Sequence, residues 1–147
     1  MKKITIFLLA CVFYTVNAKV FQRCELARTL SHWGVSRQDI LEWVCIAEFE
    51  SSFNTRAINH NNVDGSWDWG LFQINDRYWC DGGKPTSNGC GVNCRKFLTD
   101  DIGAAFNCAR KIKNAHHYDH NGFGAWVAWR NHCQGWVPSK QQTQHCF

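Results

Sequence analysis

Three acidic residues, Glu48, Glu50 and Asp68, stand among tryptophan, phenylalanine and aliphatic side chains. Glutamate is almost never fully buried unless it is paired, so the default role of each is an ordinary surface charge. Glu48 and Glu50 would point about 200° apart on a helix and cannot share one environment. Cleavage of a glycosidic bond requires one carboxylic acid kept protonated and one carboxylate kept ionised. Glycoside hydrolysis is therefore one hypothesis for these residues, and ordinary surface acids are the other.

A helix has to place the two glutamates. The segment from 37 to 50 has helical character, with Ser36 as its N-cap and Asp39 at the capping-box position. Apolar side chains occur almost all the way round its helical wheel, which is typical of a central helix. Glu50 and Glu48 each fall between two apolar neighbours on this wheel, where desolvation would raise a carboxyl pKa. Periodicity alone therefore does not choose between them.

Asp68 follows a turn signal, in the first strong strand of a short hairpin or meander that the sequence predicts between residues 57 and 75. Strand alternation sends the side chains of Trp67 and Trp69 to the face opposite Asp68. Glu50 at its helix end and Asp68 on its strand could then face one cleft from opposite walls. The side chains expected beside Asp68 are polar: Asn61, Ser66 and Asn75.

The remaining elements are helices on both sides of this small sheet. Helical spacing of apolar residues predicts helices over 23–33, 102–112 and 125–133, and the stretch 80–94 is irregular. Helices, a small sheet and then helices form an α+β pattern, with a sheet lobe inserted into a helical one. The boundary between two lobes is a natural place for a cleft.

The chain has 147 residues, of which 45% are hydrophobic, and this suits one compact domain. Residues 1–18, MKKITIFLLACVFYTVNA, have the pattern of a secretory signal, because two lysines precede an apolar run from 4 to 16 and the small Ala18 ends it. The run is too short for a membrane span, which needs roughly 20 apolar residues. We therefore expect a soluble, exported protein that begins at Lys19.

Cleavage after Ala18 would remove Cys11 and leave eight of the nine cysteines. An even number in an exported chain predicts four disulfides. A zinc site is the alternative, supported by the spacing of Cys90 and Cys94 and by the seven histidines. That spacing lacks the paired short knuckles of a structural zinc site. Eight cysteines permit 105 pairings, so spacing does not give the connectivity.

From Lys19 onward the chain resembles the c-type (chicken-type) lysozymes over essentially its whole length. The resemblance implies one lysozyme-like α+β domain over 19–147, with an inserted antiparallel sheet lobe at about 56–98, a cleft between the lobes and four disulfides. Insect-like digestive lysozymes and defensive ones share this framework, so the physiological role stays open. The motifs that carry the resemblance are KVFQRCELARTL at 19–30, WVCIAEFESSFNTRAIN at 43–59, DGSWDWGLFQIN at 64–75 and AWVAWRNHC at 125–133.

The resemblance also selects residues. It implies that Glu50, not Glu48, is the general acid and that Asp68 is the second carboxylate of a retaining mechanism. Lysozyme is itself the type example of such a carboxylate pair, so this mechanism comes from the family. The disulfides implied by position are Cys24 with Cys146, Cys45 with Cys133, Cys80 with Cys94, and Cys90 with Cys108.

The implied sugar contacts follow the same cleft. Trp126 matches the tryptophan that packs against the catalytic acid, and Tyr78 stands where some members carry a tryptophan. Trp67 stands where many members have a small polar residue, and its contact with substrate is an open question. The substrate-binding residues implied by position are Asn61, Ser66, Asn75, Tyr78, Trp79, Ala125 through its backbone, and Trp126.

The segment 113–124, KNAHHYDHNGFG, is several residues longer than the usual family loop. We expect it to extend the wall met by the distal sugars, with Tyr118 and Phe123 as stacking surfaces and with glycines that let it fold over the cleft. A metal site and a plain solvated loop are the alternatives. Its histidines, which would gain charge on acidification, are His116, His117 and His120.

Some lysozymes and the α-lactalbumins bind calcium through aspartates just before the third helix. In the matching stretch 95–108, Asp101 alone remains of four side-chain positions, and Thr99, Ala104 and Ala105 occupy the others. These side chains leave too few hard oxygen ligands for calcium. We expect no metal and no cofactor.

Three functional classes remain. The favoured one is an enzyme that hydrolyses the β-1,4 bonds between N-acetylmuramic acid and N-acetylglucosamine in bacterial peptidoglycan, for defence or digestion. A non-catalytic saccharide-binding relative would be expected to have lost Glu50, Asp68 or both. A membrane-disrupting antimicrobial is disfavoured, because without residues 1–18 the net charge is only about +2. We expect a secreted, extracellular monomer whose partner is peptidoglycan, with no nucleic acid bound and no stable membrane insertion.

Overall fold

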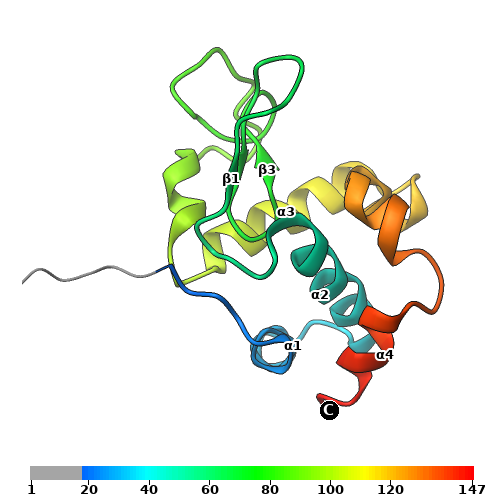
Figure 1. Ribbon diagram of the computed structural model, residues 1–147. Helices are drawn as coiled ribbons and strands as arrows, with labels where there is room; N and C mark the ends of the chain where they lie inside the picture. The colour runs from blue at the N-terminus through cyan, green and yellow to red at the C-terminus, as the bar shows by residue number, and fades with distance from the viewer. Residues whose placement is uncertain (1–17) are drawn as a thin grey trace, which may run out of the picture.

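The structure, a computed structural model, describes residues 18–147, so the signal segment expected at 1–18 lies outside the described residues except for its last residue. Figure 1 shows a helical part below and a small sheet above it, with α2 running through the middle of the helices. The α-helices are α1 (Arg23–His32), α2 (Arg37–Ser51), α3 (Gly103–Ala115) and α4 (Pro138–Gln144). The shorter helical turns are η1 (Cys94–Leu98), η2 (His120–Ala125) and η3 (Trp129–Cys133). This arrangement confirms the α+β, two-lobed fold.

The central helix α2 begins where the sequence predicts. The Ser36 hydroxyl accepts a hydrogen bond of 3.1 Å from the Asp39 backbone N–H and so caps the first turn. The Asp39 carboxylate does not complete a capping box but lies 3.5 Å from Lys113 Nζ on α3. That ion pair joins the start of α2 to the end of α3.

Trp43 on α2 is the hub of the hydrophobic core. Its side chain is 1% exposed. Its ring makes edge-to-face contacts with Phe72, Phe106, Phe123 and Trp126, at centroid distances of 5.5, 5.5, 5.0 and 5.1 Å. Such contacts add to the burial of apolar area. One side chain of α2 therefore holds together segments of the sheet lobe, α3, η2 and the chain after η2.

The sheet is the antiparallel meander that the sequence predicts. Its strands are β1 (Ile58–Asn59), β2 (Asp68–Trp69) and β3 (Ile74–Asn75), in the order β1-β2-β3. Asp68 on the middle strand stands opposite Asn59 on one side and Asn75 on the other. This register places two amide side chains next to the Asp68 carboxylate.

The four disulfides implied by the family resemblance are confirmed. Two of them tie the helical part together, one joins two points of the irregular stretch in the sheet lobe, and one joins that stretch to α3. They are Cys24 with Cys146, Cys45 with Cys133, Cys80 with Cys94, and Cys90 with Cys108.

The helix expected over 125–133 is wrong in its first part. Residues 120–125 form the turn η2, Trp126 is extended with φ −96° and ψ 123°, and helix resumes only after it, ending in the π-helical turn η3. The Trp126 indole N–H donates to the Phe72 carbonyl at 2.9 Å, a bond to the sheet lobe that periodicity cannot indicate. The break thus serves a tertiary contact.

The sequence analysis also missed α4. Its residues, PSKQQTQ, have no apolar stripe, and the side chains it buries are Ser139, Lys140 and Thr143. Lys140 Nζ donates to Glu42 on α2 at 2.7 Å. Polar contacts, not hydrophobic periodicity, therefore seat this helix. None of the helices within residues 18–147 has the length and hydrophobicity that a membrane span requires.

Candidate active site

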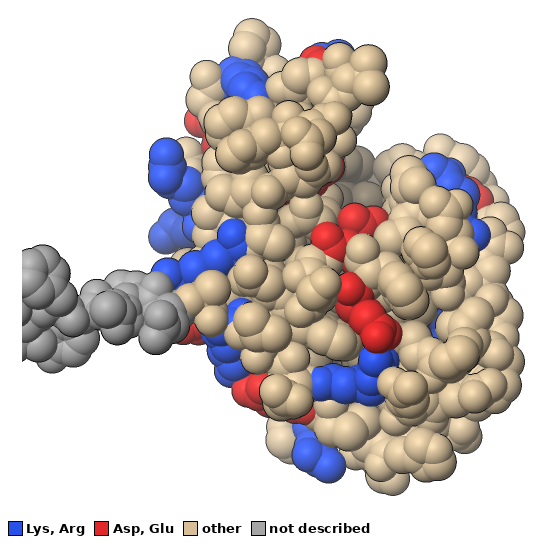
Figure 2. All heavy atoms as spheres, viewed as in Figure 1, with Lys and Arg blue, Asp and Glu red and all other residues tan. Residues whose placement is uncertain are grey.

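A cleft of about 620 Å³ runs between the two lobes, and Figure 2 shows acidic side chains at the hollow between them. The helical part contributes the end of α2 and the segment after η2, and the sheet lobe contributes its three strands and the turns between them. The lining residues are Glu50, Asn59, Asn62, Val63, Asp64, Ser66, Asp68, Gln73, Asn75, Ala125, Trp126 and Val127. The cleft thus brings Glu50 and Asp68 together, as the sequence analysis expected.

Glu50 stands in the last turn of α2 and is half-buried. Desolvation raises the pKa of its carboxyl from 4.5 to about 7, and the negative charge of Asp68 acts in the same direction. The Ala128 backbone N–H donates to Oε1 at 3.4 Å and partly opposes this shift. Next to Glu50, the Ser51 hydroxyl donates to the Leu71 carbonyl at 2.8 Å and anchors the helix end to the sheet lobe. Glu50 is therefore protonated over most of the acidic pH range and loses its proton near pH 7.

Glu48 has a different environment. Arg23 Nη2 on α1 donates to Glu48 Oε1 at 2.6 Å. Burial alone would raise the pKa of Glu48, but the hydrogen bond and the charge of Arg23 lower it below its ordinary value. Glu48 is thus an ionised partner in a structural ion pair, and the structure separates the two glutamates that periodicity left equivalent.

Asp68 accepts hydrogen bonds from three side-chain amides. Asn75 donates to Oδ1 at 2.8 Å, whereas Asn62 and Asn59 donate to Oδ2 at 2.8 and 3.2 Å. Hydrogen bonds to a carboxylate are strongest when it is ionised. The expectation that Asn61 is a neighbour of Asp68 is wrong, because Asn61 is exposed, and the nearby residues Asn59 and Asn62 occupy that role. The antiparallel pairing of Asn59 with Asp68 was the signal that could have identified Asn59.

Ser66 orients the amides around Asp68. Its buried hydroxyl accepts from Asn75 at 2.8 Å and from Asn62 at 3.2 Å, and it donates to Asp64 Oδ1 at 2.6 Å. A hydroxyl group can donate one bond and accept two, so this pattern uses its full capacity. The two amides are thereby held with their N–H groups toward Asp68.

Ala125 and Trp126 form the opposite wall, as expected. Trp126 is 5% exposed, and its contacts with Trp43 and with the Phe72 carbonyl hold the indole in place. Trp126 lines the cleft together with Glu50, so its ring contributes to the apolar setting of that carboxyl. Val127, next in the chain and 60% exposed, also lines the cleft, and the sequence analysis missed it.

Tyr78 and Trp79 do not line the part of the cleft that contains the two carboxylates. Tyr78 is 53% exposed. Trp79 is partly buried, and its ring centroid lies 6.0 Å from that of His116 in the long loop. Gly89 packs so closely on Trp79 that an added Cβ would lie 2.8 Å from the ring carbon Cε3. Trp79 therefore packs with the long loop rather than with the carboxylates, and Tyr78 presents an exposed ring next to it in the chain.

The long loop is anchored to the core, and this corrects the expectation that Phe123 is a stacking surface. Phe123 is 4% exposed and its ring lies against Trp43. Gly122 packs against the Lys113 backbone, where an added Cβ would come into severe contact with the carbonyl group. The glycines thus allow close packing, not a fold over the cleft. Tyr118, 77% exposed, remains the accessible aromatic ring of the segment.

Metal ligation finds no support in residues 18–147, where no three His, Cys, Asp or Glu side chains are grouped so that they could hold a metal ion. Asp101, the remaining carboxylate of the calcium-binding pattern, accepts a hydrogen bond of 2.9 Å from the backbone N–H of Gly103, the first residue of α3. Its side chain has a local structural role.

Comparisons with known proteins agree with this geometry. The model of the C-type lysozyme/alpha-lactalbumin family matches residues 19–146. Lysozyme C of Scophthalmus maximus is 54% identical over 81% of this chain and 82% of its own, and lysozyme C-2 of Mus musculus is 51% identical over 82% of each. A crystal structure of a lysozyme from Litopenaeus vannamei superposes with a TM-score of 0.80 at 42% identity, covering 88% of this chain and 98% of that one.

Proposed function

Because the chain belongs to the C-type lysozyme/alpha-lactalbumin family, we propose that it is a lysozyme that hydrolyses the β-1,4 glycosidic bonds of bacterial peptidoglycan, with Glu50 as general acid and Asp68 as the second carboxylate. The observation that carries this proposal is the pair itself. One carboxyl group in the cleft has a pKa raised to about 7, and the other accepts three amide hydrogen bonds. Such a division between two carboxyl groups is what the reaction requires.

The reaction begins with the proton of Glu50. Glu50 transfers it to the glycosidic oxygen, the bond between that oxygen and the sugar C1 breaks, and positive charge develops on the sugar ring. Asp68, on the facing wall, stabilises this charge or attacks C1 to give a glycosyl-enzyme intermediate. Glu50, now ionised, then takes a proton from water as the water attacks C1. The product retains the β configuration.

The walls of the cleft suit an N-acetylated saccharide. Asn75 and the Ala125 backbone offer polar groups, and Trp126 offers an apolar surface beside them. Ser66, whose buried hydroxyl is fully hydrogen-bonded within the protein, contributes by orienting Asn75. Asn61 is exposed at the adjoining turn and stays a candidate for a sugar contact, although it does not contact Asp68. These assignments name the sugar-binding residues expected near the bond that is cleaved.

The distal wall is formed by Trp79, His116 and Tyr118. The ring of His116 lies 6.0 Å from Trp79 and 6.1 Å from Tyr118, so the three side chains form a continuous aromatic row. With Tyr78, this row would contact sugars remote from the bond that is cleaved. Because Phe123 is buried, Tyr118 is the ring of the long loop that carries this role.

The second candidate function is non-catalytic saccharide binding, since the family also includes the alpha-lactalbumins. Clearing of a bacterial wall suspension by the wild-type protein and by Glu50→Gln distinguishes the two functions. We expect the wild type to clear the suspension and Glu50→Gln to bind walls without clearing them. Equal clearing by both proteins, or by neither, would contradict the proposed function.

We also propose that residues 1–18 are a signal peptide and that the secreted protein is a monomer that binds no nucleic acid. The support for export is the pattern of two lysines, an apolar run and a small residue before Lys19. Expression in a secreting host should give a protein in the medium whose N-terminal sequence begins KVFQ. An N-terminus at Met1, or a dimer in size-exclusion chromatography, would contradict these proposals.

A further inference from the structure

Asp76 is a buried carboxylate that the proposed reaction does not use. Its side chain is 2% exposed, and it follows β3 directly. Because side chains alternate along an extended chain, it leaves the sheet on the face opposite Asn75, which lines the cleft. A buried charge is costly unless hydrogen bonds and an opposite charge compensate it. The contacts that compensate Asp76 show what it holds in place.

The first contacts are with Trp67, the residue before Asp68. The Trp67 backbone N–H donates to Asp76 Oδ1 at 2.9 Å, and the Asp76 backbone N–H donates to the Trp67 carbonyl at 2.9 Å. Both backbone groups of Trp67 are therefore bonded to the same residue. The main chain on one side of Asp68 has little freedom to shift.

The next contact is with Trp69, the residue after Asp68. The Trp69 indole N–H donates to Asp76 Oδ2 at 3.3 Å, and Trp69 is 4% exposed. The two oxygens of a carboxylate accept and do not donate, so they match these two N–H donors. Asp76 thus binds the residues on both sides of Asp68 from behind the sheet.

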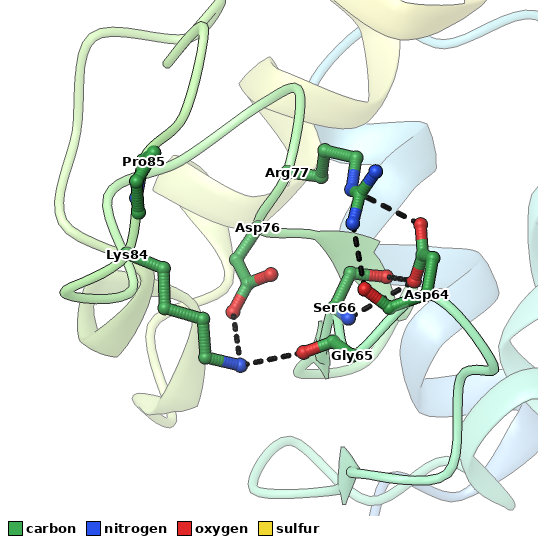
Figure 3. Close-up of a pocket in the computed structure, with 7 residues that line it drawn as sticks. All are labelled: Asp64, Gly65, Ser66, Asp76, Arg77, Lys84 and Pro85. Atoms are coloured by element: carbon green, nitrogen blue, oxygen red, sulfur yellow. Dashed lines mark hydrogen bonds and ion pairs between the residues drawn. The ribbon is translucent and has the colours of Figure 1, made fainter.

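Lys84 completes this arrangement from a facing loop, as Figure 3 shows. Its Nζ lies 3.8 Å from Asp76 Oδ2, donates to the Gly65 carbonyl at 2.8 Å and stands 4.1 Å from the centre of the Trp67 ring. The His60 ring lies 4.0 Å from the same indole. Trp67 is therefore covered by protein side chains, and its contacts are with this assembly rather than with the cleft.

Gly82 packs against Asp76 without space for a side chain. A Cβ at this position would lie 2.6 Å from Asp76 Oδ2. On the cleft side, the Asn75 amide donates a hydrogen bond to Asp68. On the other side, Asp76 accepts hydrogen bonds from Trp67 and Trp69, the two residues that flank Asp68. The strand that carries Asp68 is held from both faces.

We infer that Asp76 is a positioning residue for Asp68: it fixes the strand β2 at the distance from Glu50 that the reaction needs. The inference rests on the proposed role of Asp68. Misplacement of a reacting group by about 1 Å can reduce a rate by about 100-fold. In Asp76→Asn, an NH2 group replaces one of the two carboxylate oxygens, and an NH2 group cannot accept a hydrogen bond. Either the Trp67 backbone N–H or the Trp69 indole N–H would then lose its acceptor.

The test is steady-state kinetics on a soluble peptidoglycan oligosaccharide. We expect Asp76→Asn to lower kcat by about tenfold or more with KM changed by less than about twofold, since the cleft walls stay in place. Gly82→Ala should act in the same direction, because it displaces the Asp76 carboxylate and keeps its charge. Asp81→Asn is the matched control: an exposed carboxylate in the same lobe whose Oδ1 accepts from the Gly83 N–H, a bond that asparagine can keep.

A double-mutant cycle separates positioning from a general loss of structure. In the Asp68→Asn background, Asp76→Asn should cause no further loss of kcat, because the group that it positions is already absent. Equal losses in both backgrounds, or a lowered melting temperature with unchanged kcat in both Asp76→Asn and Gly82→Ala, would overturn the inference. Full activity of Asp68→Asn alone would instead overturn the proposed function.

Discussion

Glu48 Oε1 and Arg23 Nη2 lie 2.6 Å apart and form an ion pair between α2 and α1, two residues before the carboxyl that we assign as the general acid. The pair is mostly shielded from solvent, with 28% and 18% of the two side chains exposed. The pair keeps Glu48 ionised, so Glu48 cannot act as the proton donor that we assign to Glu50. The two glutamates therefore have separate and testable functions.

The first prediction compares these two glutamates. Glu48→Gln should lower the free energy of unfolding by about 1–3 kcal/mol, because it weakens a charged hydrogen bond in a partly buried place. Its kcat should stay near that of the wild type. Glu50→Gln should show the reverse, with folding intact and activity lost. Chemical denaturation and wall-clearing assays measure both effects, and loss of activity in Glu48→Gln with a normal fold would contradict the assignment.

The second prediction concerns activity and pH. The carboxyl of Glu50 has its pKa raised to about 7, so the proton that it donates is lost as the pH rises through about 7. The alkaline limb of the profile of kcat/KM should therefore fall near that pH. A profile that stays flat to pH 9 on a soluble oligosaccharide would exclude Glu50 as the acid.

The third prediction concerns stability and pH. Between pH 4.5 and about 7 the folded protein keeps a proton on Glu50 that the unfolded chain has released. Stability from this group is therefore full below pH 4.5 and falls as the pH rises through about 7. Glu50→Gln removes the cost of holding an ionised carboxylate in a desolvated place. It should therefore be more stable than the wild type at pH 8, by on the order of 1–3 kcal/mol. At pH 4 the two proteins should be nearly equal in thermal unfolding.

The fourth prediction tests the distal wall. Tyr118→Ala should raise KM for a long peptidoglycan strand by about 2- to 10-fold, because one stacking contact is lost. It should leave a short oligosaccharide unaffected, and Tyr118→Phe, which keeps the ring, should behave as the wild type. An equal change for both substrates would show that the loop is a neutral insertion.

The fifth prediction tests the anchoring of the long loop. Gly122 has φ +88° and no space for a Cβ, whereas Gly34 has φ +75° and nothing within 4 Å. Gly34→Ala should cost about 1–2 kcal/mol of stability, from backbone strain alone. Gly122→Ala should cost clearly more, because the Lys113 backbone must also move. Equal losses of stability in urea denaturation would indicate a loop that is loosely attached to the core.

Much of this protein follows from local sequence patterns. The N-cap at Ser36, the helical periodicity of α1 to α3 and the turn signals around the sheet all depend on residues within a few positions of one another, and the structure confirms them. The pairing of the cysteines required the family resemblance as well, since their spacing permits many connectivities. Local patterns and the resemblance together thus specified the α+β fold and named Glu50 and Asp68.

Only the tertiary structure decided what surrounds those two carboxylates. Arg23 reaches Glu48 from a different helix, the Ala128 N–H reaches Glu50 from 78 positions away in the sequence, and Asn59 reaches Asp68 across a strand pair. The break at Trp126, the burial of Phe123 and the contacts of Asp76 are likewise long-range. Desolvation and hydrogen bonding depend on which groups meet in space, and these set the protonation of a carboxyl group, whereas periodicity reports only the direction in which a side chain leaves its own helix or strand.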